Sequence, residues 1–223
     1  MARSYTLHTP ATAGSIDFAA ALNEQQLAAV QSPPGASLVI AGAGSGKTRT
    51  LTYRVAWLLE QGISPSSILL LTFTNKAAKE MIERVRDLLP GAGDGIWNGT
   101  FHSIGNRILR RHPEGVGFRE GFSIMDREDS EDMIASVLAK DGVVTTNKRF
   151  PKAGVLSDIF SYSINTGSPI SKVLAEKYRY FIPLAADIER VQGQYEARKK
   201  EANSMDFDDL LSKTLELFLT NPE

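Results

Sequence analysis

A glycine-rich loop constrains this 223-residue chain more than any other feature: Ala41-Gly42-Ala43-Gly44-Ser45-Gly46-Lys47-Thr48. An apolar run at 37–41, which predicts a short buried strand, precedes the loop, and a segment at 47–61 with apolar residues at helical spacing follows it. The glycines let the backbone wrap around phosphates with its amide N–H groups pointing inward. The helix that follows turns its positive end toward the same point. This context predicts a site for a nucleoside triphosphate.

The loop residues have distinct expected roles. The backbone of residues 41–46 is expected to surround the phosphates, and Lys47 to reach the β- and γ-phosphates. The Thr48 hydroxyl is the expected Mg²⁺ ligand. Ala41 stands where the strict pattern has glycine, at a position that ends the strand and need not approach the phosphates closely. The alternative is a glycine-rich turn followed by a chance Lys-Thr.

Strands and helices alternate between residues 37 and 111, which predicts a mostly parallel sheet covered by helices. Helices are expected at 23–30 with Asn23 as N-cap, at 47–61 with Gly62 just past its end, at 75–88 capped by Asn75, and at 103–111. Residues 68–73 predict a second, fully buried strand and 96–100 a weaker third.

After about residue 112 the pattern becomes mostly helical. A short strand is expected at 122–125, and helices at 127–140, 152–165, 183–202 and 206–219, with a loop at 141–151. The predicted organisation is therefore a flexible leader (1–21), an α/β domain (22–111), a helical inserted subdomain (112–203) and a return helix (204–223).

Composition excludes several classes of protein. The net charge of −1 rules out binding of nucleic acid through chain-wide positive charge, so any such contact must be local. Without cysteine the chain has no disulfides, thiolate metal sites or cysteine nucleophiles, which fits a cytoplasmic location. It also has no apolar run long enough for a membrane-spanning helix.

Four further segments, taken in order with the glycine-rich loop, closely resemble superfamily 1 DNA helicases of the UvrD/Rep/PcrA type. The resemblance extends from about residue 22 to the C-terminus. The second and third segments are the most specific. The segments are residues 22–26 (LNEQQ), 72–81 (TFTNKAAKEM), 99–103 (GTFHS) and 205–211 (MDFDDLL).

The resemblance implies a partial RecA-like P-loop domain that binds ATP and Mg²⁺. Gln26 matches the family glutamine that recognises adenine, for which a carboxamide offers both a donor and an acceptor. A surface glutamine is the alternative. Arg49 matches a family residue near the nucleotide, or is a solvated arginine in the first turn of a helix.

The same resemblance implies contacts with single-stranded DNA. They fall at Phe73, Thr74 and Asn75 after the second strand, and at Thr100, His102 and Ser103 after the third. Ligands in such sheets bind outside the carboxyl ends of the strands, where an exposed aromatic ring can stack on a base. Phe73 could instead be a core residue. The basic cluster Arg107, Arg110, Arg111 and His112 is either a solvated helix end or a DNA contact.

Two acidic segments are candidates for the family's catalytic Asp-Glu pair, and both are rejected. Asp126 and Asp129 are expected to cap the helix at 127–140. Asp206, Asp208 and Asp209 are expected to open the helix at 206–219, because the polar residues 201–204 before them do not predict a strand. The chain is therefore expected to end before the Asp-Glu pair and the rest of the motor.

We expect the parent protein to be an ATP-dependent DNA helicase, with a role in DNA unwinding and DNA repair. Its expected partners are single-stranded DNA, single/double-strand junctions, the missing C-terminal half of its own chain, and repair or replication proteins. The 223-residue chain is expected to be marginally stable and inactive alone. The alternatives are the helicase subunit of a helicase–nuclease, a P-loop small-molecule kinase, and a binding module without turnover.

Overall fold

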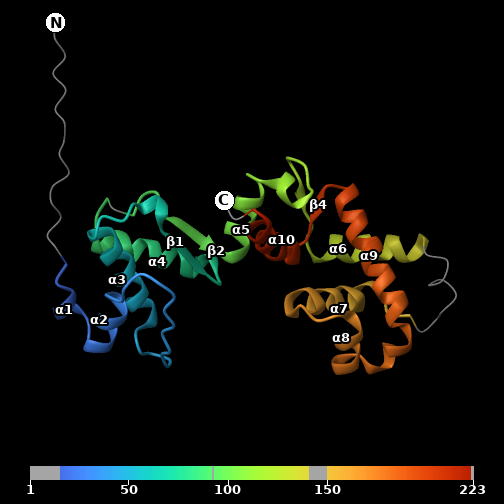
Figure 1. Ribbon diagram of the computed structural model, residues 1–223, viewed down its shortest axis with the longest axis horizontal. Coiled ribbons are helices and arrows are strands. Elements are labelled where there is room, and N and C mark those ends of the chain that lie inside the picture. The colour runs from blue at the N-terminus through green and yellow to red at the C-terminus, as the bar shows by residue number, and fades with distance from the viewer. Residues whose placement is uncertain (1–15, 92, 141–149, 222–223) are drawn as a thin grey trace, which may run out of the picture. The chain divides into compact units, whose positions relative to one another are not determined.

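The chain folds into two compact units of α-helices and small parallel sheets (Figure 1). The computed structural model describes residues 16–91, 93–140 and 150–221. One unit ends at Phe101 and the other begins at His102. None of the helices within those ranges is long and apolar enough to cross a membrane.

The first unit contains a parallel pair of strands, as the alternation of strands and helices predicts. β1 (Leu69–Thr72) pairs with β2 (Trp97–Thr100), and the register places Thr72 opposite Thr100. The other elements of this unit are α1 (Phe18–Ala21), α2 (Glu24–Val30), α3 (Lys47–Glu60), the 3₁₀ helix η1 (Pro65–Ser67) and α4 (Asn75–Leu88).

One face of the β1–β2 pair is covered by α4. Met81 and Val85 of α4 are buried in one cluster with Leu70 of β1. Successive side chains of a strand point to opposite faces, so Leu69 lies on the other face and is half-exposed. The predicted fully buried strand at 68–73 is therefore wrong in its limits and in its burial, because one face lacks a covering layer among the described residues.

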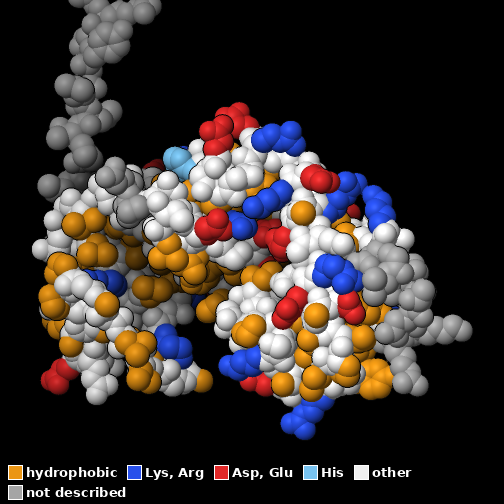
Figure 2. Space-filling model, turned by 45° about the vertical axis from the view of Figure 1, so that its right-hand side comes forward, with side chains coloured by type: hydrophobic (Ala, Val, Ile, Leu, Met, Phe, Trp, Pro, Cys, Tyr) orange, Lys and Arg blue, Asp and Glu red, His pale blue; other side chains and the backbone are white. Residues whose placement is uncertain are grey.

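The predicted buried strand at 37–41 is also wrong. These residues form no strand, and the side chains of Leu38 and Ile40 are 87% and 90% exposed. A strand is held by a hydrogen-bond ladder to a neighbour. None of the described residues forms such a ladder with this segment. Figure 2 shows many hydrophobic side chains on the visible surface of the first unit.

Local signals located the ends of α2, α3 and α4 with one exception. Asn23 caps α2, and its side chain and that of Gln26 form a reciprocal capping box. Gly62 follows α3 with a φ of +82°, as expected of a residue just past a helix end. The exception is α4, which Thr74 caps, not Asn75: the Thr74 hydroxyl accepts the Ala77 N–H at 3.1 Å.

The second unit is mostly helical. A buried cluster joins α6, α7, α8 and α9, and includes Ile134, Leu156, Leu174 and Ile188. Its elements are α5 (Phe101–Leu109), which starts at the junction of the units, η2 (Pro113–Val116), β3 (Ser123–Ile124), α6 (Arg127–Lys140), α7 (Ala153–Thr166), α8 (Ile170–Lys177), η3 (Arg179–Leu184), α9 (Ala185–Glu201), β4 (Ser204–Met205) and α10 (Phe207–Thr220).

Three features of this unit differ from the expectation. The two-residue strand β4 pairs in parallel with β3 and precedes Asp206, where no strand is predicted. The helix α8 is not predicted at all, and α5 begins at Phe101 instead of residue 103. Most of the loop predicted at 141–151 lies outside the described residues.

Candidate nucleotide and nucleic-acid site

The glycine-rich loop makes a tight turn immediately before α3. Gly44 and Gly46 have φ angles of +76° and +82°, a region that only glycine adopts without strain. The Ser45 hydroxyl donates to the Gly42 carbonyl oxygen at 2.8 Å and closes the turn. Gly46 is the N-cap of α3 and makes no side-chain capping bond, so no side chain of the cap satisfies the first amides of the helix.

The ammonium group of Lys47 lies against this loop. Its Nζ atom donates to the carbonyl oxygens of Gly42 at 2.7 Å and Ala41 at 3.1 Å. Lys47 and Thr48 are the first two residues of α3, so a cation and a hydroxyl lie at the positive end of a helix. This combination of an uncapped helix N-terminus, an ammonium group and a glycine turn suits an anion such as a phosphate.

A cleft of about 340 Å³ lies beside the loop. Gln26 lines it from α2, where its Nε2 donates to the Ser45 carbonyl oxygen at 3.1 Å and its Oε1 accepts the Asn23 N–H at 3.2 Å. The carboxamide therefore links the start of α2 to the loop. A Cβ atom on Gly46 would lie 2.7 Å from Gln26 Nε2, so the Gln26 side chain would have to move to admit it.

Arg49 points away from the carbonyl groups that hold Lys47. Its guanidinium donates to the Ala21 carbonyl oxygen at 2.8 Å and lies over the Tyr53 ring, 5.2 Å from the centroid. With Arg84 and Asp87 it lines a separate cleft. The contact between Arg49 and a nucleotide stays a prediction.

Four of the six predicted DNA-contacting residues lie at the carboxyl ends of β1 and β2. Phe73 follows the last residue of β1 and is 92% exposed, so it is not a core residue. Thr74 and Asn75 form the cap and first residue of α4, and Thr100 ends β2. The chain passes into the second unit after Phe101, so His102 and Ser103 belong to that unit.

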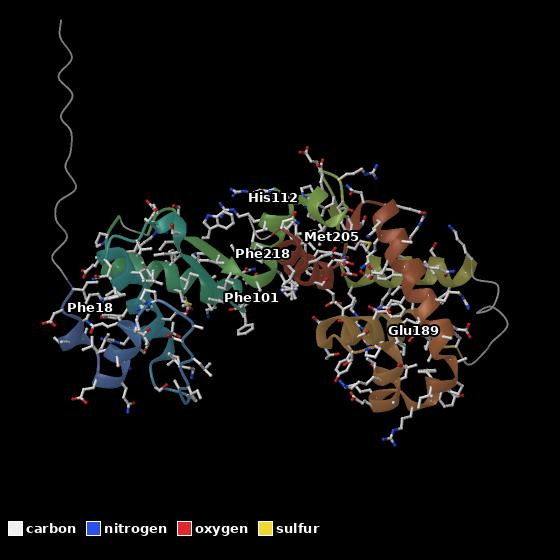
Figure 3. The ribbon with its side chains drawn as sticks, viewed as in Figure 1. Phe18, Phe101, His112, Glu189, Met205 and Phe218 are labelled. Carbon is white, nitrogen blue, oxygen red and sulfur yellow. The ribbon has the colours of Figure 1, made fainter. Side chains whose placement is uncertain are left out.

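The structure places Phe101, to which the sequence assigned no role, beside Phe73. The ring centroids are 5.6 Å apart at an interplanar angle of 37°, and Phe101 is 44% exposed. In Figure 3 the Phe101 side chain stands clear of the ribbon where β2 gives way to α5. The sequence alone did not indicate this contact, because it depends on the register that places Thr72 opposite Thr100.

Within the basic cluster of Arg107, Arg110, Arg111 and His112, Arg110 has a structural role. Its Nη1 donates to the Phe122 carbonyl oxygen at 3.0 Å, and the guanidinium lies 4.5 Å from the centroid of the Phe122 ring. His102 makes an edge contact with the ring of Phe207, at 6.0 Å between centroids. Among the described residues no group of three or more His, Asp or Glu is placed to hold a metal ion.

The acidic segments have the structural roles expected of them. Asp126 and Asp129 accept each other's backbone N–H at the start of α6, at 2.9 and 3.2 Å. Asp206 and Asp209 form the same capping box at the start of α10.

A buried ion cluster joins α9 to α10. Lys199 Nζ lies 2.8 Å from Asp206 Oδ2, 2.7 Å from Asp209 Oδ2 and 2.9 Å from Glu196 Oε1. The hydroxyl of Tyr195 donates to Asp206 Oδ2 at 2.9 Å. Sequence reasoning missed this cluster, because a lysine in a run of polar residues gives no sign that it is buried.

Burial and charge act against each other on the pKa values of this cluster. Burial alone would lower the pKa of Lys199, but Asp209 and Asp206 raise it above its ordinary value. Burial would raise the pKa of Asp206, yet the Lys199 ammonium holds it below its usual range. For Asp209 burial prevails over the attraction of Lys199 and raises the pKa to about 6.

Comparison with known proteins accounts for nearly the whole chain. The sequence matches the UvrD/REP helicase N-terminal domain family over residues 22–223. It is 40% identical over 205 residues to the ATP-dependent DNA helicase PcrA of Bacillus subtilis (strain 168). It is 37% identical over 203 residues to the proteins of the same name from Staphylococcus aureus (strain Mu50) and Staphylococcus epidermidis (strain RP62A). In each case the matched region spans 91% of this chain and 27% of the relative. The chain therefore belongs to the UvrD/REP helicase N-terminal domain family.

Proposed function

We propose that this chain is the ATP-binding and single-stranded-DNA-binding N-terminal part of an ATP-dependent DNA translocase that separates DNA strands. The relatives that it matches are named ATP-dependent DNA helicases. Because the chain spans 27% of their length, we propose the helicase activity for the whole protein of which this chain would be part.

The observation that carries the proposal is the placement of Lys47. Its ammonium is held by two loop carbonyl oxygens at the uncapped N-terminus of α3, beside the cleft that Gln26 lines. A triphosphate would replace those carbonyls as the partner of the ammonium and receive the loop amides. The Gln26 carboxamide would exchange its bonds to Asn23 and Ser45 for an adenine edge.

Magnesium fits this site through Thr48. Mg²⁺ takes oxygen ligands, keeps several waters and is commonly held by one or two protein groups together with substrate phosphates. Thr48 provides a hydroxyl oxygen in the first turn of α3, directly after Lys47 in the chain. When bound, the ion would neutralise the charge on the phosphate oxygens.

The single strand would lie along the carboxyl ends of β1 and β2. The exposed Phe73 ring offers a stacking surface to any base. The Thr74 hydroxyl accepts the Ala77 N–H and can still donate its own proton to a phosphate. The N-terminus of α4 favours negative charge at the same point. Asn75, Thr100, His102 and Ser103 are further proposed contacts.

The 223-residue chain itself would bind ATP with little turnover. Phosphoryl transfer to water needs a group that orients the attacking water. The described residues that line the cleft include no carboxylate. The finer architecture is also part of the proposal: a partial RecA-like domain that carries both ligands, and a helical inserted subdomain at 112–203, supported by the helical cluster of the second unit. Junction DNA, and repair or replication proteins, would be partners of the whole protein.

Phosphate release with and without a thymidine oligonucleotide tests the function. For the full-length protein we expect the oligonucleotide to stimulate release, and the Lys47→Ala variant to abolish it. For the 223-residue chain we expect both ligands to bind without release. Transfer of the γ-phosphoryl group from ATP to a small-molecule acceptor, independent of DNA and without release of free phosphate, would instead support a P-loop kinase.

A further inference from the structure

Two aromatic side chains form an exposed pair at the edge of the small sheet in the first unit. Phe73 is 92% and Phe101 44% exposed, and their ring centroids are 5.6 Å apart. Large apolar side chains are normally buried, so two adjacent exposed rings point to a surface that another molecule covers. We call Phe73 and Phe101 the ring pair.

The strand register fixes the ring pair. Thr72 and Thr100 are opposite each other in the parallel ladder, and each phenylalanine directly follows one of them, just beyond the end of its strand. Adjacent strands lie about 4.8 Å apart, so equivalent residues present their side chains side by side. The backbone hydrogen bonds of the ladder therefore bring the two phenylalanines together, and the Phe101 ring contacts the Phe73 ring.

The surroundings of the ring pair favour a negatively charged, base-bearing chain over an apolar peptide. Beside Phe73 begins α4, a 14-residue helix whose N-terminus is positive. Lys76, in its first turn, is exposed, and its ion pair with Glu80 spans 4.0 Å, so the ammonium is loosely held. An apolar partner would leave this charge without compensation, whereas a phosphate backbone would neutralise it.

We infer that Phe101 is a positioning residue for single-stranded DNA: it holds the Phe73 ring so that the pair stacks with a base as one unit. This inference rests on the proposed function. Because a ring fixed in advance loses little freedom on binding, removal of Phe101 should weaken binding even where the base touches Phe73 alone.

Four variants of the 223-residue chain test this inference by titration with a fluorescent thymidine oligonucleotide: Phe73→Ala, Phe101→Ala, the double variant and Phe101→Leu. Each alanine variant should lose about 5-fold to 150-fold in affinity, the range for one stacked base. The double variant should lose much less than the product of the two single losses, because the rings act as one unit. Phe101→Leu should keep the packing and restore only part of the affinity.

Two controls separate the inference from a structural effect. Tyr180 is 66% exposed and its ring lies 5.4 Å from that of the partly buried Phe181, so Tyr180→Ala removes the exposed ring of another aromatic pair and should leave affinity unchanged. The dependence of affinity on salt should be the same in wild type and Phe101→Ala, because the salt slope counts phosphate contacts.

Other outcomes would contradict either the positioning role of Phe101 or the proposed DNA site. If Phe73→Ala weakens binding and Phe101→Ala does not, or if the two losses multiply, the positioning role of Phe101 is wrong and the proposed DNA site stands. If the loss for Phe101→Ala only follows a loss of folded protein in a thermal melt, Phe101 is a packing residue. If neither variant weakens binding, stacking at this edge is wrong and the proposed function loses its DNA site.

Discussion

Replacing Lys199 by methionine should strongly destabilise the second unit. Lys199 is fully buried and lies within 2.9 Å of three carboxylate oxygens, one on α9 and two at the start of α10. Methionine preserves most of the length and the apolar stem of lysine but removes the charge. The Lys199→Met variant would therefore leave Asp206 and Asp209 buried without their cation.

The magnitude follows from the geometry of the cluster. At 2.7–2.8 Å the attraction of Lys199 for each aspartate is a gross energy of about 6 kcal/mol at an effective dielectric constant of about 20. Desolvation and the repulsion between the carboxylates offset much of this. Removing one partner of a buried ion pair typically costs about 3–5 kcal/mol, which is the loss of stability that we expect at pH 7.

Urea unfolding measured with two signals can locate the loss. Trp57 and Trp97 both lie in the first unit, so their fluorescence reports on that unit, whereas far-UV circular dichroism also follows the helices of the second. The matched control is Lys200→Met, the next residue of α9, whose side chain is exposed. Its unfolding free energy should change by no more than about 0.5 kcal/mol.

The pH dependence gives a second check. Without Lys199, burial should raise the pKa of both Asp206 and Asp209, so the folded variant binds protons at higher pH than the folded wild type does. By linkage, the difference in stability between Lys199→Met and wild type should shrink as the pH falls from 8 to 5. Equal losses for Lys199→Met and Lys200→Met, or a difference that grows at low pH, would refute the reasoning.

Three further predictions concern packing, titration and nucleotide choice. Gly105→Ala should lower stability by about 1–3 kcal/mol, because its Cβ would lie 2.6 Å from the Leu210 carbonyl oxygen. A Cβ added to the exposed helical Gly193 would meet nothing within 4 Å, so Gly193→Ala should gain about 0.5–1 kcal/mol in the same urea assay; equal effects would refute the contact. Burial raises the pKa of Asp209 to about 6, above its ordinary value, so the folded state binds this proton more tightly than the unfolded state. This group should therefore stabilise the second unit as the pH falls through about 6, a gain that circular dichroism should detect in wild type and not in Asp209→Asn. Gln26→Ala should bring the affinities for ATP and GTP closer together in a competition titration, and an unchanged ratio would show that Gln26 does not recognise adenine.

The sequence predicted the helices of this protein better than its strands. Asn23, Gly62 and the Asp126–Asp129 pair marked helix ends because capping is local, and the buried apolar residues of α8 were also visible in its sequence, though overlooked. Strands depend instead on a neighbouring strand to pair with, as the predicted strand at 37–41 and the observed strand β4 show. Leu38 and Ile40 have the composition of a strand but no ladder, whereas Ser204 and Met205 form one with residues 81 positions earlier.

The sequence indicates the residues of the candidate site better than the contacts among them. The glycine-rich loop indicates a nucleotide because its residue types are dictated by backbone geometry. The sequence could not indicate that Gln26 is tied to Ser45, or that Arg49 bonds to Ala21, since these are tertiary contacts. Phe101 was missed for a different reason: its importance appears only when the register sets it beside Phe73.

A crossed binding measurement tests the central claim most directly. Wild type, Lys47→Ala and Phe73→Ala are titrated separately with a fluorescent ATP analogue and with a fluorescent thymidine oligonucleotide. We predict that Lys47→Ala loses the nucleotide and keeps the oligonucleotide, and that Phe73→Ala keeps the nucleotide and binds the oligonucleotide about 5-fold to 150-fold more weakly. Nucleotide binding that survives Lys47→Ala, or an oligonucleotide affinity that Phe73→Ala leaves unchanged, would contradict the account.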